Sequence, residues 1–233
     1  MPTAKSARER VRREITGEIL QVARAHLDKE GPGALSLRSI ARELEIAPSA
    51  LYRYFDGRDA LLTSLIQDAY ESLAEVAEGA ASRAEGQSPR SRFTAVPRAM
   101  RAWALEHRNE WALIFGTPVP GYDAPETTVA PYARLGAALV QPVIEAGASG
   151  GFASSAGSDE PGDAELSESL RPVTEALMPG FPSSTVAKVM RTWSMLVGAI
   201  SLEIFGHWRK TVLEPSVLFE TIVIDCADSL GLV

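Results

Sequence analysis

Apolar residues recur at three- and four-residue steps through most of this 233-residue chain. That spacing places them on one face of an α-helix. The pattern begins with Ile15, Ile19 and Val22 and returns in nearly every later segment. No segment alternates apolar and polar residues in the way that a half-buried strand does. We therefore predict an all-α fold.

The predicted helices are separated by glycine and proline. We expect a long helix from residue 59, a break over Gly79–Ser91 and a loop over Gly116–Ala124. A second loop, which we expect to be mobile, covers the Gly-, Ser- and Ala-rich stretch 147–162. The other helices are predicted over 15–27, 37–44, 48–55, 93–108, 109–115, 126–146, 165–178, 183–208 and 214–230, with Pro131 and Pro142 limiting or kinking 126–146.

The net charge of −7 hides two unlike parts. Residues 1–58 hold 11 Lys and Arg against 8 Asp and Glu, a net charge of +3, whereas residues 59–233 hold 12 against 22, a net charge of −10. Such charge asymmetry indicates that the two segments have different functions. The leader carries Lys5, Arg8, Arg10, Arg12 and Arg13, which by themselves fit either a solvated leader or a nucleic-acid contact.

Two short predicted helices follow the first long one. Ser36 is placed to cap residues 37–44, and Pro48 suits the first turn of the next helix. Three residues, 45–47, separate the two helices, which is a helix-turn-helix spacing. The second helix carries the run Leu51-Tyr-Arg-Tyr-Phe55, in which Leu51 and Phe55 share the inward face. The hydroxyl and guanidinium donors around them suit phosphate contacts.

The runs Leu35–Leu44 and Ala47–Leu62 resemble the TetR/AcrR family of transcriptional regulators. The likeness rests on the initiating Ser36, on Ile40-Ala41 and on Leu51-Tyr-Arg-Tyr-Phe55 followed by a basic residue and Leu61-Leu62. Two positions depart from the family pattern. Glu45 stands where the family usually has Gly, and Ala47 stands where a Ser or Thr cap is common.

The resemblance implies a double-stranded DNA operator as partner. By it, Pro48, Ser49 and Ala50 face base edges and Arg38 reaches a base or phosphate. Tyr52, Tyr54 and Arg58 hold phosphates, and Arg53, at a variable position, reads guanine. In the alternative interpretation, Tyr52 and Tyr54 are core aromatics and Arg53 is a solvated charge.

The same resemblance implies a domain division. Residues 1–58 would be a three-helix helix-turn-helix DNA-binding domain, and residues 59–233 a helical bundle for ligand binding and homodimer formation. The stretch Thr192–Gly206 is similar to the penultimate helix of the WHG-type C-terminal domain of this family. The helix from Ser183 is apolar nearly all round, which fits a dimer face or pocket as well as the centre of a monomeric bundle.

Aromatic and Met side chains mark a candidate site for a small apolar or aromatic effector, although a stripe of this kind also fits plain core. His107 is the one polar group in the stripe that could orient a ligand. The candidates are Met100, Trp103, His107, Trp111, Phe115, Tyr132, Met178, Trp193 and Val197.

Enzyme signatures are missing from the sequence. Its three histidines have no metal-binding spacing, no Gly-rich phosphate loop follows a strand, and the single cysteine, Cys226, forms no disulfide framework. We expect no enzyme activity, cofactor, metal or membrane span, and a cytoplasmic location. The prediction is a ligand-responsive repressor that binds a palindromic operator as a homodimer. The alternative is a helical small-molecule-binding or catalytic protein that does not bind DNA.

Overall fold

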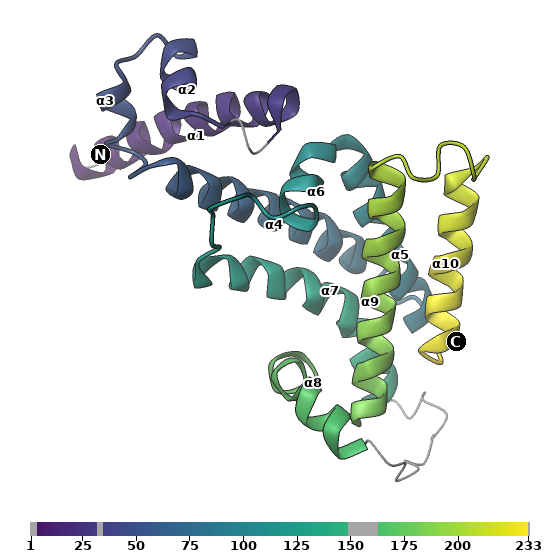
Figure 1. Ribbon diagram of the computed structural model, residues 1–233. Coiled ribbons are helices and arrows are strands. Elements are labelled where there is room, and N and C mark those ends of the chain that lie inside the picture. The colour runs from purple at the N-terminus through teal and green to yellow at the C-terminus, as the bar shows by residue number, and fades with distance from the viewer. Residues whose placement is uncertain (1–3, 32–34, 149–162, 233) are drawn as a thin grey trace. The chain divides into compact units, whose positions relative to one another are not determined.

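The computed structural model describes residues 4–31, 35–148 and 163–232 (Figure 1). Within these ranges the secondary structure is helical and contains no strand, which confirms the predicted all-α fold. The helices are α1 (Ala4–Glu30), α2 (Leu37–Glu43), α3 (Pro48–Leu51), α4 (Arg58–Arg83), α5 (Pro89–Glu106), α6 (Arg108–Phe115), α7 (Val129–Ala148), α8 (Asp163–Leu177), α9 (Ser183–Ile204) and α10 (Pro215–Ser229), with a short 3₁₀ helix η2 (Glu126–Thr128).

The chain divides into two compact units. The first unit comprises the residues up to Ala69 together with Asn109–Thr128, and the second unit comprises Tyr70–Arg108 and the residues from Val129. This division by contacts lies inside α4, whereas the functional boundary that the sequence suggests, between residues 58 and 59, lies at the start of this helix. The functional boundary stays a prediction.

The core of the first unit joins α1, α2, α3 and the first turns of α4. Gly31 ends α1 in the left-handed region at φ 75°, and its N–H donates to the carbonyl of Leu27. Glycine adopts this conformation without a Cβ clash, as the sequence predicts for this turn. The buried side chains of the core include Ile19, Leu27, Ile40, Leu51, Phe55, Leu61, Leu62 and Leu65.

Helix α6 and the loop after it also belong to the first unit. Asn109 donates to the Asp28 carboxylate at 2.9 Å, and Arg24 lies 3.3 Å from Glu110. Val119 from the loop is buried in the same core as α1 and α2. A segment distant in sequence therefore completes the unit that carries the helix-turn-helix.

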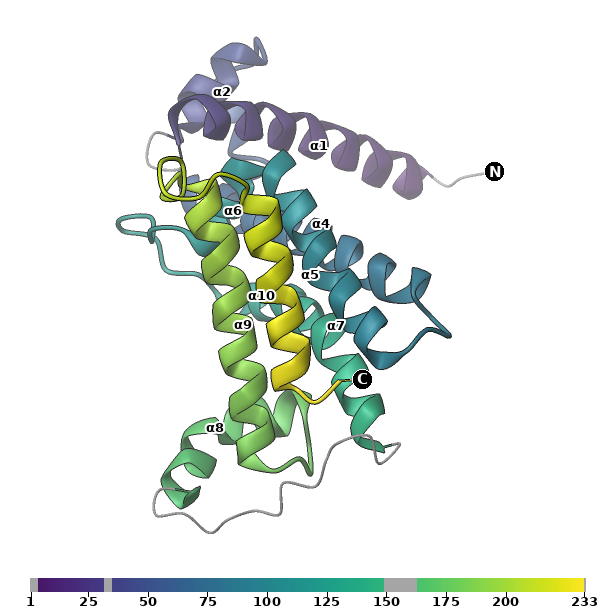
Figure 2. The same ribbon diagram turned by 90° about the vertical axis from the view of Figure 1, so that its right-hand side faces the viewer.

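The second unit is a bundle around α5. Helix α5 packs on α7, α9 and α10, and α8 packs on α7 and α9. Helices α9 and α10 run side by side (Figures 1 and 2). No helix in the described ranges is both long and apolar enough to cross a membrane.

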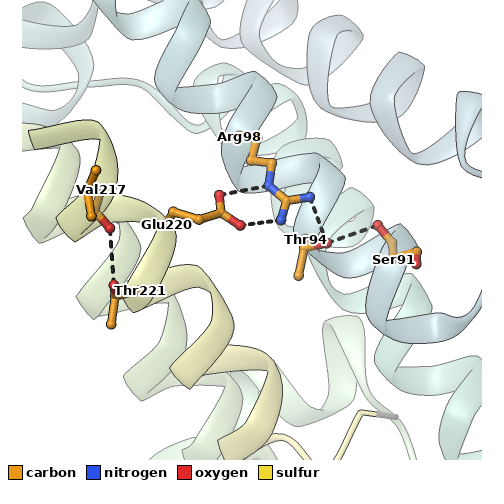
Figure 3. A network of polar contacts seen from close by, with 6 residues as sticks. All are labelled: Ser91, Thr94, Arg98, Val217, Glu220 and Thr221. Atoms are coloured by element: carbon orange, nitrogen blue, oxygen red, sulfur yellow. Dashed lines mark hydrogen bonds and ion pairs between the residues drawn. The ribbon is translucent and has the colours of Figure 1, made fainter.

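Polar contacts tie α10 to α5 (Figure 3). Arg98 donates through two nitrogens to the carboxylate of Glu220 and through a third to the hydroxyl of Thr94. That hydroxyl in turn donates to the carbonyl of Ser91. The hydrogen bond from Arg98 lowers the pKa of Glu220, so this carboxylate stays charged at neutral pH.

Several predicted boundaries are wrong. Helix α4 continues through Gly79 to Arg83, so the break before α5 is shorter than predicted. Helix α9 ends at Ile204 and not at residue 208, because Gly206 adopts a left-handed φ of 79°. Helix α7 continues through Pro142 to Ala148. Most of the predicted loop 147–162 lies outside the described residues.

Candidate nucleic-acid interface and apolar cavity

The helix-turn-helix starts as the sequence predicts. Ser36 holds the N-cap position of α2 with extended backbone, although its side chain makes no capping hydrogen bond. Pro48 occupies the first turn of α3, where its missing N–H costs no helical bond. Ala47 precedes it with extended backbone at φ −64° and ψ 137°. Ala47 thus has the backbone geometry of a cap residue but offers no side-chain hydrogen bond to the helix.

The turn between α2 and α3 is closed by two backbone hydrogen bonds. The N–H of Ile46 donates to Ala41 at 3.0 Å, and that of Glu45 donates to Arg42 at 3.2 Å. This is the pattern of a Schellman motif, which requires a left-handed residue just after the helix. Glu45 takes that conformation at φ 56°. The departure from glycine noted in the sequence thus lies at the one strained position of the turn.

Helix α3 has a buried and an exposed face. Leu51, the last residue of α3, is 0% exposed, and Phe55, four residues after it, is 4% exposed, so both anchor this segment in the core. Tyr52 is 52% exposed, and Pro48 and Ser49 are also exposed. The structure therefore exposes two of the three predicted base-facing residues, Pro48 and Ser49, together with the predicted phosphate-binding Tyr52.

The other predicted contacts surround this surface or lie beside it. Arg38 on α2 and Arg53 after α3 are exposed, whereas Ala50 and Tyr54 are half-buried. Arg58, the first residue of α4, is partly covered and lies 3.9 Å from the Asp59 carboxylate.

A contact from α1 was missed by the sequence analysis. Arg12 donates to the backbone carbonyl of Arg53 at 3.3 Å, and its guanidinium lies 5.5 Å from the ring centroid of Tyr54. His26, also on α1, lies 2.8 Å from Glu43 at the end of α2. The basic leader is thus helical from Ala4 and supports the motif directly. The clustering of arginines was the available signal, but their partners are distant in sequence.

An apolar cavity of about 210 Å³ lies within the second unit, between α7, α8 and α9. Three of the predicted effector residues line it, namely Tyr132, Met178 and Trp193. The lining also includes Val173 and Leu177 from α8, which the sequence analysis missed. Nothing in the sequence of α8 separates these residues from an ordinary apolar helix face.

The other predicted effector residues do not line this cavity. Met100 and Trp103 are buried in the second unit, where the Trp103 indole donates to Ser72 at 3.0 Å and stacks on His107. Trp111 is fully buried in the first unit and contacts Phe115. Val197 is half-buried on α9. Core and cavity aromatics share the same helical spacing, so the sequence could not distinguish them.

Comparisons with known proteins agree with this architecture. Residues 19–65 match the family described as "Bacterial regulatory proteins, tetR family", and residues 93–225 match "Tetracyclin repressor-like, C-terminal domain". The HTH-type transcriptional regulators Rv1816 of Mycobacterium tuberculosis and Mb1846 of Mycobacterium bovis are each 36% identical over 216 residues, which is 91% of this chain and 91% of theirs. The chain belongs to the TetR family of transcriptional regulators.

Solved structures place the TetR-family fold over nearly the whole chain. The solved structure of the protein SCO4313 has a TM-score of 0.78 and 35% identity, covering 94% of this chain and 98% of its own. The TetR-family regulator PfmR from Thermus thermophilus shares the fold at a TM-score of 0.55 and 18% identity, covering 91% of this chain and 96% of its own. The TetR-family match at residues 19–65 includes α2, the turn and α3.

Proposed function

We propose that this TetR-family regulator is a ligand-responsive repressor that binds a palindromic DNA operator as a homodimer. The observation that carries the proposal is that α3 has one buried and one exposed face. Leu51 lies on the buried face, while Ser49 and Tyr52 are exposed next to the exposed Arg53. A short, firmly anchored helix with an exposed polar front suits the major groove of DNA.

The positive charge of the N-terminal region favours DNA binding. Arg10, Arg12 and Arg13 are exposed on α1, in the segment whose net charge is +3. Cationic side chains that neutralise phosphates supply much of the affinity for DNA. The remaining −10 lies in residues 59–233, which we propose sense the effector and dimerise.

The homodimer is proposed from an exposed apolar surface on α9 and α10. Leu202 and Met195 on α9 are 42% and 48% exposed, and Val217 on α10 is 64% exposed. Phe205, just after α9, is 45% exposed. A second copy of the chain would cover these side chains. A two-fold dimer then presents two α3 helices to half-sites about 34 Å apart, which makes the operator palindromic.

Repression follows if the effector stabilises a conformation that binds DNA poorly. Such coupling between two sites is typically about 1–3 kcal/mol. A ligand with equal affinity for both conformations would change nothing. The apolar cavity at Tyr132 and Trp193 is the proposed effector site.

The test is selection of fragments from the source genome by the tagged, full-length protein, followed by binding measurements on the enriched sequence. We expect an inverted repeat, and scrambling one half-site should weaken binding by at least about tenfold, or 1.4 kcal/mol. No enrichment, together with no binding to any duplex near about 50 mM salt, would favour the alternative of a helical protein without a DNA role.

A further inference from the structure

Among the described residues, no charged side chain lines the cavity between α7, α8 and α9. Within this described lining, Tyr132 and Trp193 are the only side chains with an O–H or N–H group, and the rest are aliphatic, Met, Ala or Gly. The lining consists of Tyr132, Ala133, Gly136, Leu139, Val140, Val173, Leu177, Met178, Val186, Val189, Met190 and Trp193.

This lining disfavours an ionised ligand. A carboxylate or ammonium group that enters such a cavity loses its hydration and finds no opposite charge. An apolar molecule, by contrast, exchanges water for contacts with side chains such as Val189 and Leu139.

The volume limits the size of the ligand. A cavity of about 150 Å³ lined by aliphatic and aromatic side chains is known to hold benzene. The present cavity of about 210 Å³ is larger by roughly the volume of a few further atoms. A Cβ at Gly136 would already lie in van der Waals contact with the Leu177 side chain on α8, at 3.4 Å, so a larger side chain at this position would occupy cavity space.

The polar groups gather at one end of the cavity. Tyr132 is 40% exposed, and its ring packs edge-on against Trp193 at 5.9 Å and against Tyr70 at 5.6 Å between centroids. Burial raises the pKa of Tyr132, while a hydrogen bond with Trp193 lowers it. The phenol therefore stays neutral at physiological pH and can hydrogen-bond a neutral polar group.

We propose that this cavity binds an uncharged, mainly apolar molecule of about one ring, with at most one hydrogen-bonding group, which faces Tyr132. This molecule is the effector, an assignment that rests on the proposed function. Binding itself rests only on the cavity.

Four one-ring probes test the inference on the full-length protein, titrated by calorimetry at neutral pH. Benzyl alcohol and toluene are neutral, whereas benzoate and benzylammonium are charged. We expect benzyl alcohol to bind and each ion to bind at least about tenfold more weakly. Equal or tighter binding of benzoate or benzylammonium would overturn the inference, as would failure of both benzyl alcohol and toluene to bind up to their solubility limits.

Two variants locate the binding. Gly136→Leu places a side chain in the cavity from α7, and we expect it to weaken benzyl alcohol binding by at least about tenfold. Ala137→Leu, on the exposed side of the same helix, is the matched control and should bind as the wild type does. Val173→Phe fills the cavity from α8 if Gly136→Leu fails to fold, which circular dichroism will show. Unchanged binding in a folded blocking variant would overturn the assignment.

Operator binding without any probe separates this inference from the proposed function. A wild-type protein that binds its operator but ignores every neutral probe contradicts the cavity assignment alone. A protein that binds benzyl alcohol in the cavity but no DNA contradicts the proposed function alone.

Discussion

The guanidinium of Arg12 donates a hydrogen bond to the backbone carbonyl of Arg53 and lies over the ring of Tyr54. It thereby joins α1 to the residues just after α3, 41 positions later in the chain. Tyr54 is half-buried against the core of the first unit. The exposed part of the motif is thus held by the buried Leu51 and by the contacts that Arg12 makes with Arg53 and Tyr54.

Replacing Arg12 should destabilise the first unit modestly. Arg12→Ala removes one side-chain hydrogen bond and one exposed cation–π contact, and we expect a loss of about 1 kcal/mol in the free energy of unfolding. Arg10→Ala removes only an exposed ion pair of 3.8 Å with Glu14 and should change it by less than about 0.5 kcal/mol. Urea denaturation of both variants measures this, and an equal effect would contradict the structural role of Arg12.

Glycine at position 45 should stabilise the motif. Glu45 has φ 56°, where a side chain costs about 1–2 kcal/mol, partly offset by the greater freedom of glycine in the unfolded chain. We expect Glu45→Gly to raise the free energy of unfolding by about 0.5–1 kcal/mol. Arg42→Gly, an exposed position inside α2, is the control and should lower it by about 1 kcal/mol. Destabilisation by Glu45→Gly would contradict the left-handed conformation of residue 45.

Substitutions at the proposed phosphate contacts and at the proposed base contacts should have different effects on DNA binding. Tyr52→Phe and Arg58→Ala should weaken binding similarly for every duplex. Ser49→Ala and Arg53→Ala should change the preferred operator sequence, by about 1–3 kcal/mol per affected base pair. Gel-shift titrations on operator and random duplexes measure both effects. Unchanged affinity for both classes of variant would contradict the placement of α3 on DNA.

Two Arg–Glu pairs that hold α5 in the bundle should differ in strength. Arg101 and Glu203 lie 2.7 Å apart with side chains 20% and 12% exposed, whereas Arg98 and Glu220 are 46% and 45% exposed. We expect Glu203→Gln to cost about 2 kcal/mol and Glu220→Gln less than about 1 kcal/mol. Thermal and urea unfolding will compare them, and a larger cost at Glu220 would contradict the burial described here.

Stability should fall in alkaline solution because of buried acidic groups. Burial raises the pKa of the Cys226 thiol from 9.0 to about 11 and that of Tyr70 from 10.0 to about 12. Between pH 9.0 and about 11 the native state keeps a thiol proton that the unfolded state releases. The free energy of unfolding therefore falls as pH rises, by at most about 1.4 kcal/mol per pH unit for this thiol.

Cys226→Ala isolates this contribution. The variant should lose the decline that begins near pH 9.0 and keep the one that begins near pH 10.0 from Tyr70. Urea denaturation across this range gives both slopes. Parallel curves for the variant and the wild type would contradict a buried, protonated thiol.

Local signals in the sequence predicted where the helices of the helix-turn-helix begin. Ser36, Pro48 and the spacing of Leu51 and Phe55 act within a few residues, so the placement of α2 and α3 follows from them. The contact of Arg12 with Arg53 and the burial of Val119 depend on chain segments far apart, which periodicity does not reveal. The turn at Glu45 was marked by the sequence as unusual, and the structure shows its backbone reason.

The cavity was only partly predictable. Tyr132, Met178 and Trp193 were named because aromatic and Met side chains suit apolar ligands, and they do line it. Trp103 and Trp111 were named for the same reason and are core residues. Whether an apolar helix face meets another helix or an empty space depends on packing between helices, such as the close approach of Gly136 to Leu177.

The salt dependence of DNA binding tests the central claim most directly. Fluorescence anisotropy of a labelled operator, measured with the intact protein from about 50 to 200 mM salt, gives the association constant at each step. We predict a linear decline of its logarithm with the logarithm of salt concentration, amounting to about a thousandfold across this range. No binding near 50 mM salt, or an affinity that salt leaves unchanged, would contradict the claim that α3 and its arginine-rich surroundings bind DNA.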